Sequence, residues 1–256
     1  MELYAIKTPI VEPGDDLALV IVESVKRAGF ELADDDVLVV AESVVATAQG
    51  RRVSLSSITD VSSEAHALAS RYSLDPRLAE LILQESDGVV GGLPGVVLAI
   101  VHGFLIANAG IDASNAGGGD NVVLLPREPQ CEADGLRSRV EQATGASIGV
   151  ILADSRVLPL RRGVVGIAIA TSGIEAVEDC RGRLDLFGRP LKITFRAVAD
   201  DIATAAQLLL GEANEQTPVV LVRGAPVKHS EMDQSSVATL TPEECLYFAA
   251  FRDPWA

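Results

Sequence analysis

Short runs of aliphatic and β-branched residues alternate with longer amphipathic stretches along the whole chain, and this alternation restricts the possible folds more than any other feature. Strands are expected over residues 3–6, 36–41, 96–102, 104–108, 122–125, 147–153, 164–171, 191–197 and 219–223. Helices are expected over residues 15–29, 62–72, 76–85, 132–144, 200–210 and 243–251. The pattern predicts a mixed α/β (α+β) fold whose strands need not form one parallel sheet.

Turn and cap signals divide these elements. Asp75 and Pro76 suit the N-cap and the first position of a helix, and Gly29 suits the end of the first helix. Residues 88–95 (GVVGGLPG) are rich in Gly and Pro and are expected to form a loop or a hairpin turn. We therefore expect a single catalytic unit over residues 1–256, with 88–95 as the weak boundary between any two subdomains.

Charge and cysteine content exclude several classes of protein. The 256 residues include 36 acidic and 21 basic side chains, a formal net charge of −15. Proteins that bind nucleic acid or anionic membranes need a basic face, so neither partner is expected. Three widely spaced cysteines without a CxxC argue against a disulfide framework and favour a reducing cytoplasm. No signal peptide or membrane span is expected, because no uncharged apolar run reaches about 18 residues.

Standard catalytic and phosphate-binding motifs do not identify a function for this sequence. The sequence has no Walker A loop, no HExxH and no GxGxxG after a strand. Residues 145–149 (GASIG) match G-x-S-x-G formally, but a nucleophile elbow needs a strand before its serine and a helix after it. Ser147 has the reverse context, so we interpret this segment as the end of a helix followed by the start of a strand.

Three carboxylates lie where apolar runs end. Asp112 follows the expected strand 104–108, Asp154 follows 147–153, and Glu212 follows the expected helix 200–210. Carboxylates that converge from separate segments repel one another unless a cation lies between them, and oxygen ligands favour Mg²⁺ or Mn²⁺. Ser155 would add a hydroxyl ligand and Asn115 a polar contact. The alternative is that these acids are ordinary turn and cap residues.

Two adjacent arginines, Arg161 and Arg162, lie between apolar segments in the sequence LPLRRGVVG. An arginine in this position suits bidentate binding of a phosphate or carboxylate, so either residue is a candidate to hold an acyl phosphate or a substrate carboxylate. The alternative is a solvated surface position where both pair with the surplus acids.

Six blocks of the sequence, taken together and in this order, resemble the coenzyme F420-0:L-glutamate ligase family. They are residues 36–51 (DVLVVAESVVATAQGR), 108–115 (NAGIDASN), 154–173, 182–191, 198–212 and 218–224. The most specific are NAGIDASN and the Asp-Ser…Arg-Arg-Gly block. The resemblance covers most of the chain and implies an unusual α/β fold in an intertwined homodimer. No fused nitroreductase-like domain is expected.

The resemblance implies a GTP-dependent amide ligase. In the family, GTP phosphorylates the terminal carboxylate of coenzyme F420-0, a deazaflavin precursor. The amine of L-glutamate then attacks the acyl phosphate and forms a γ-linked amide. A divalent metal, Mg²⁺ or Mn²⁺ at two sites, is required, and K⁺ stimulates the reaction.

The resemblance also assigns residues. The positions that match metal ligands are Asp112, Asp154, Ser155 and Glu212, and Asp154 is the carboxylate on which catalysis is expected to depend. The positions that match nucleotide contacts are Thr8, Pro9, Ile10, Val11, Glu42, Ser43, Asn115 and Gly211. Two independent arguments therefore predict the same metal ligands. Placement in the chain and the family resemblance both point to Asp112, Asp154 and Glu212.

Two departures from the family sequence keep alternatives open. Thr47 stands where the family commonly has lysine, and residues 213–216 contain no glycine where the family has several. The alternatives are γ-glutamyl ligation to another carboxylate acceptor, such as a folate-like cofactor, and a non-catalytic nucleotide-binding paralogue.

Overall fold

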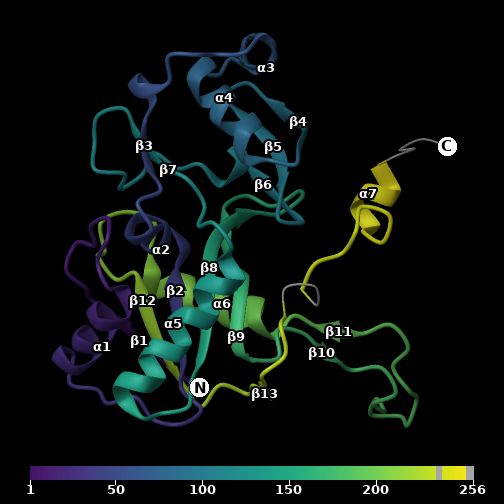
Figure 1. Cartoon of the computed structure of the whole chain (residues 1–256). Coiled ribbons are helices and arrows are strands. Elements are labelled where there is room, and N and C mark those ends of the chain that lie inside the picture. The colour runs from purple at the N-terminus through teal and green to yellow at the C-terminus, as the bar shows by residue number, and fades with distance from the viewer. Residues whose placement is uncertain (235–237, 252–256) are drawn as a thin grey trace.

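A six-stranded sheet forms the centre of the protein (Figure 1). The computed structural model describes residues 1–234 and 238–251. The strand order is β1 (Glu2–Ile6), β12 (Val219–Arg223), β2 (Val37–Ala41), β8 (Gly149–Val157), β9 (Val164–Ile174) and β13 (His229–Ser230). β2 and β8 pair in parallel, and the other pairs of this sheet are antiparallel.

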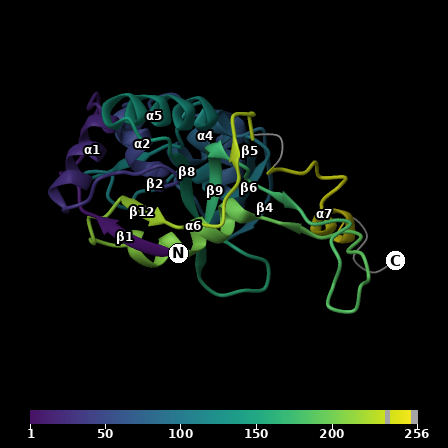
Figure 2. The ribbon, with the colours of Figure 1, turned by 90° about the horizontal axis from the view of Figure 1, so that it is seen from below.

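Helices cover both faces of this sheet, which explains why its strands are almost continuously apolar. One face packs against α1 (Leu17–Arg27), α2 (Glu42–Ala48) and α5 (Pro129–Thr144), and the other against α6 (Val198–Leu210). Figure 2 shows α1 and α5 on the side of the sheet opposite α6. Along β8, Val150 and Leu152 lie in the α5 layer, whereas Ile151 and Ala153 lie in the α6 layer.

A β-bulge interrupts this alternation in β9. The register with β8 shifts next to Ala153, and the consecutive residues Ile169 and Ala170 both face the α5 layer. Asp200 in the first turn of α6 accepts the N–H of Ala168 at 2.9 Å, so the bulge keeps a hydrogen-bond partner. The extra residue therefore leaves few backbone groups without a hydrogen bond, and it bends β9 next to α6.

A second layer of structure lies above the end of the central sheet, where β2 and β8 finish (Figure 1). It contains α3 (Ser63–Tyr72), α4 (Pro76–Glu85) and the sheet β4 (Gly88–Leu93), β5 (Val96–Val101) and β6 (Phe104–Ala107). The ribbon of β3 (Arg52–Ser54) and β7 (Asn121–Val123) connects it to the central sheet. This layer has a hydrophobic core of its own, centred on Ile82, Val97 and Ala99.

Most of the expected elements are confirmed, including the caps at Asp75 and Gly29. Asp75 accepts the N–H of Arg77 at 2.8 Å, and Gly29 has a φ of +86° just after α1. Ser147 lies between the end of α5 and the start of β8, which is the context expected for it. Short 3₁₀ helices, η1 (Leu55–Ser57) and η2 (Asn108–Gly110), follow β3 and β6, and α7 (Leu246–Phe251) starts three residues later than expected.

Three expected boundaries are wrong. The strand 191–197 is reduced to β11 (Phe195–Arg196), which pairs with β10 (Glu178–Asp179), and the chain between them forms an exposed arm. Residues 88–93 form β4, and the turn is limited to Pro94 and Gly95. β8 continues through Val157 instead of ending at 153, because β9 pairs with it along its full length.

Within the described ranges 1–234 and 238–251, no helix is long and apolar enough to cross a membrane. Cys131, Cys180 and Cys245 are all unpaired.

Candidate active site

The parallel pairing of β2 and β8 brings two acidic residues together at one edge of the central sheet. Ala41, the last residue of β2, is the register partner of Ala153. Glu42 follows Ala41 directly and opens α2, and Asp154 follows Ala153 within β8. The carboxyl ends of adjacent parallel strands are a recurrent place for ligand sites.

The antiparallel neighbours bring two further segments to the same edge. β12 begins next to Ala41, whose N–H donates to the carbonyl of Pro218 at 2.9 Å. β1 ends at Ile6 opposite Val219, so residues 7–12 leave the sheet at this edge. The Gln216 side chain donates to the carbonyl of Thr8 at 2.9 Å and ties these two segments together.

A further wall comes from the second layer. Asp112 pairs with Val123 through two backbone hydrogen bonds, of 3.0 and 2.8 Å, and its carboxylate accepts the N–H of Ser114 at 2.8 Å. The Asn115 side chain donates to the carbonyl of Ala213 at 2.9 Å, which joins this loop to the segment after α6. Only glycine fits at residue 110 in this loop, because its φ is +73° and a Cβ there would lie 2.5 Å from the Leu125 side chain.

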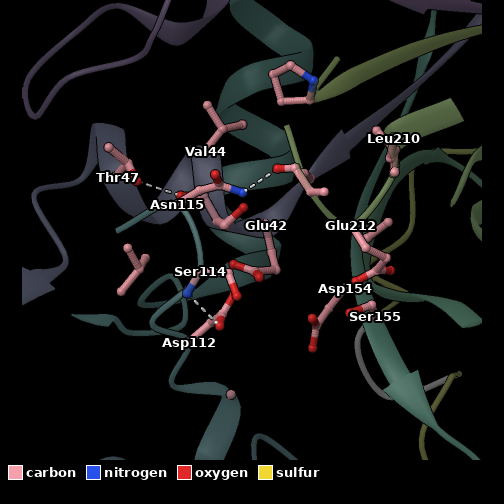
Figure 3. A pocket seen from close by; sticks show the side chains of 18 of the residues that line it. Glu42, Val44, Thr47, Asp112, Ser114, Asn115, Asp154, Ser155, Leu210 and Glu212 are labelled. Carbon is pink, nitrogen blue, oxygen red and sulfur yellow. Dashed lines mark hydrogen bonds between the residues drawn. The ribbon is translucent and has the colours of Figure 1, made fainter. Parts of the chain in front are cut away.

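These segments together enclose a cavity of about 1030 Å³. Figure 3 shows Glu42, Asp112 and Asp154 directed into it, with Ser155 and Glu212 further along its wall. Every residue expected to bind metal or nucleotide lines this cavity: Thr8, Pro9, Ile10, Val11, Glu42, Ser43, Asp112, Asn115, Asp154, Ser155, Gly211 and Glu212. The sequence therefore identified the segments that meet here.

The arginines of the cavity are not the expected pair. Arg161 and Arg162 lie on an exposed turn between β8 and β9 and do not line it. The cations that line it are Arg52 and Arg156. Arg156 was detectable in the sequence, because it lies two residues after Asp154 and alternate residues of a strand share a face. Arg52 had no comparable signal.

Burial and mutual repulsion dominate the electrostatics. Burial raises the pKa of Glu42 well above its ordinary value, and the charges of Asp154 and Asp112 raise it further. Burial also raises the pKa of Asp154, although Arg156 acts in the opposite direction with a hydrogen bond of 2.6 Å. Arg52 and Arg156 do not balance the acidic side chains that line the cavity, so the site favours an added cation.

The donors do not form a closed metal cage. In the part of the chain that the structure describes, no three His, Cys, Asp or Glu side chains are grouped closely enough to hold an ion by themselves. The carboxylates instead line an open cavity wide enough for a polyphosphate. Mg²⁺ typically keeps several waters and binds through one or two carboxylates plus substrate phosphates, so an open set of hard oxygen donors fits it.

β8 separates the oxygen donors into two groups. Asp154 continues the alternation of Val150 and Leu152 and lies on the face of α2, as does Glu42. Ser155 continues the alternation of Ile151 and Ala153, so it lies on the face of the sheet that packs against α6. Glu212 follows α6 on that second face, where its carboxylate accepts a hydrogen bond from Gln207. The cavity thus offers one group of oxygens on each side of the sheet edge.

Comparisons with known proteins show which family the chain resembles. The model of the F420-0:gamma-glutamyl ligase family matches residues 5–224. A "Coenzyme F420:L-glutamate ligase" of Methanothermobacter thermautotrophicus is 40% identical over 237 residues, which are 92% of this chain and 93% of that protein. Proteins of the same name are 45% identical in Methanopyrus kandleri (84% and 82% covered) and 41% identical in Archaeoglobus fulgidus (86% and 85%).

Proposed function

The chain belongs to the F420-0:gamma-glutamyl ligase family, and from that premise we propose that it joins L-glutamate to coenzyme F420-0 through a γ-linked amide, with GTP as the phosphate donor. One structural observation carries the proposal: acidic and hydroxyl side chains from separate segments line one cavity with the backbone of residues 8–11 and 211–213. The names of the relatives supply the acceptor and the amino acid.

The proposed reaction has two steps. An oxygen of the F420-0 carboxylate attacks the γ-phosphorus of GTP, a new P–O bond forms, and the bond to the β-phosphate oxygen breaks so that GDP leaves with the electron pair. The amine nitrogen of L-glutamate then attacks the acyl carbon. A C–N bond forms, the C–O bond to phosphate breaks, inorganic phosphate leaves with the electron pair, and the amine proton passes to the departing phosphate or to water.

Protein residues have defined tasks in this scheme. Asp112 and Asp154 would hold one divalent cation, and Ser155 and Glu212 a second one across the sheet edge. Mg²⁺ or Mn²⁺ bound there would neutralise phosphate charge during phosphoryl transfer. The Asn115–Ala213 hydrogen bond holds the two loops of the cavity wall together. The Gln216–Thr8 hydrogen bond fixes the segment placed to contact the nucleotide.

A homodimer is part of the proposal, and the arm between β10 and β11 supports it. The arm projects from the central sheet (Figure 1) and carries four strongly exposed apolar side chains: Leu184, Leu186, Phe187 and Ile193. Apolar groups gathered on a projecting segment are typical of a protein–protein interface. Sedimentation velocity would test this, because a monomer at micromolar concentration contradicts it.

The test of the activity is direct. The protein is incubated with F420-0, L-glutamate, GTP and Mn²⁺, and the product is examined by mass spectrometry for one or more added glutamyl units. We expect ligation that requires all four components, stops with EDTA and is stimulated when Na⁺ is replaced by K⁺. Absence of any glutamyl product under these conditions rejects the proposal.

A second acceptor is a specific alternative, because the cavity lacks a cation at residue 47. Thr47 is buried and its hydroxyl donates to the carbonyl of Ser43 at 2.8 Å, so it offers no charge to a ligand. Phosphate release that depends on a pterin acceptor, and not on F420-0, would favour this alternative. Metal-dependent GTP binding without turnover would favour a non-catalytic paralogue.

A further inference from the structure

We propose that Arg156 binds the carboxylate of the acceptor and holds it for phosphorylation. The inference rests on the proposed ligase function and assigns to Arg156 the substrate contact that the sequence suggested for Arg161 or Arg162.

The first observation is an unused hydrogen-bond donor inside the cavity wall. Arg156 is only 6% exposed and lines the cavity. Its Nε donates to the Asp154 carboxylate at 2.6 Å, but its Nη2 is buried without any hydrogen-bond partner. A buried guanidinium N–H without a partner is unfavourable, so a ligand that accepts a hydrogen bond from it gains stability from the contact.

The second observation is that Arg156 is held rigidly. Asp154 fixes its Nε edge, and the guanidinium lies over the ring of Phe104 with 5.2 Å from Cζ to the ring centroid. A planar group fixed on one edge and one face presents its remaining N–H groups in a defined direction. Such a fork binds carboxylates and phosphates with less loss of side-chain freedom than a mobile surface arginine.

The surroundings of Arg156 indicate which substrate it meets. The nearby cavity wall is apolar and partly exposed, with Leu105, Val157 and Val164 each 40–55% exposed. The wall formed by residues 8–12 and 211–217 is richer in polar groups and suits a polyphosphate. An organic acid with a large ring system fits the apolar wall better than glutamate does. Arg156 lines the same cavity as this wall and pairs with Asp154, where the acceptor's carboxylate would approach the transferred phosphate.

The chemistry requires no proton transfer by Arg156. Its Nη2 donates to one carboxylate oxygen and leaves the other free to attack the γ-phosphorus. After transfer, the same N–H remains beside the acyl phosphate, whose added charge it stabilises. Electron pairs move as in the scheme above, so no oxidant, reductant or further co-reactant is needed.

The test compares four variants, Arg156→Gln, Arg156→Lys, Arg162→Gln and Arg77→Gln, after the wild-type protein has been shown to ligate glutamate to F420-0. A wild type without ligation refutes the proposed function itself. Arg156→Gln removes the charged donor, and Arg156→Lys keeps charge without the fork. Arg77→Gln is the matched control, because Arg77 also pairs with a carboxylate two residues earlier, Asp75 at 2.6 Å, and lies outside the cavity lining.

We expect Arg156→Gln to raise the KM for F420-0 by about 10- to 100-fold, the range for losing a hydrogen bond to a charged group, while the KM for GTP changes less than about twofold. Arg156→Lys should recover part of this loss. Arg77→Gln should leave the KM for F420-0 unchanged. A purely structural role would change both KM values and the melting temperature together. The inference is overturned if the KM for F420-0 is unchanged in Arg156→Gln, or if Arg162→Gln raises it instead. Arg156→Lys supplies the same readout should the glutamine variant fail to fold.

Discussion

Gly166 of β9 packs directly against the backbone of α6, and replacing it with alanine tests how the cavity wall is supported. A Cβ at residue 166 would lie 2.4 Å from the carbonyl oxygen of Ala203 and 3.1 Å from Cβ of Gln207. Ordinary contact begins at 3.4 Å, so α6 would have to move outward by about 1 Å (3.4 − 2.4). Overpacking of this kind costs about 1–3 kcal/mol. For a domain of this size, that lowers Tm by about 2–12 °C.

The same substitution should also impair ligation, because Gly166 is the register partner of Ser155 and α6 leads directly to Glu212. The assays are thermal unfolding by circular dichroism and glutamyl transfer by mass spectrometry. Gly135→Ala is the control. Gly135 is exposed in α5, and a Cβ there would have no atom within 4 Å, so alanine should raise the unfolding free energy by about 1 kcal/mol. A Gly166→Ala protein as stable and as active as wild type would refute the packing argument.

Three further substitutions test other parts of the molecule. Asp154→Asn keeps volume but removes a ligand charge and the charged partner of the buried Arg156, so ligation should be lost and Tm should fall, and full activity would reject the metal assignment. Arg51→Met leaves its partner Glu85 unpaired and should lower the unfolding free energy in urea by about 3 kcal/mol, with partial recovery when Glu85→Leu is added. Burial would raise the pKa of Glu178, but Arg183, Arg196 and Lys228 outweigh it and hold the pKa below the ordinary 4.5. The stability it contributes is thus present above pH 4.5 and lost as pH falls through the lowered pKa, so Glu178→Gln should flatten the acid limb of a Tm–pH profile.

The central sheet and the members of the site could be predicted because both depend on local patterns. β2, the first five residues of β8 (149–153) and residues 219–222 of β12 are buried or nearly so and read as apolar runs. Asp112 and Glu212 could be predicted because each follows an apolar segment, β6 for Asp112 and α6 for Glu212, and polar residues at the ends of such segments often line clefts. These signals need only the order of residues along the chain.

The remaining features depend on contacts between distant segments. The segment 191–197 has a strand-like composition, but its ladder with β10 covers only two residues. The backbone hydrogen bonds of Leu191 go to Gly182 and Arg183 within the arm, so most of the segment stays exposed there. The unused Nη2 of Arg156 depends on Phe104 and Asp154 filling the other sides of the guanidinium. No pattern in the sequence reports which hydrogen-bond donors remain unpaired after folding.

The parallel pair β2–β8 explains why this acidic protein can host a polyanionic substrate. Parallel pairing places Glu42 and Asp154 at one edge, and the alternation of β8 sends Asp154 and Ser155 to opposite faces. Had both residues faced the same layer, Glu212 after α6 could not share the second face with Ser155. One extended strand therefore divides the oxygen donors into two groups along one cavity, and two cations held there would counter the phosphate charges that the net charge of −15 otherwise repels.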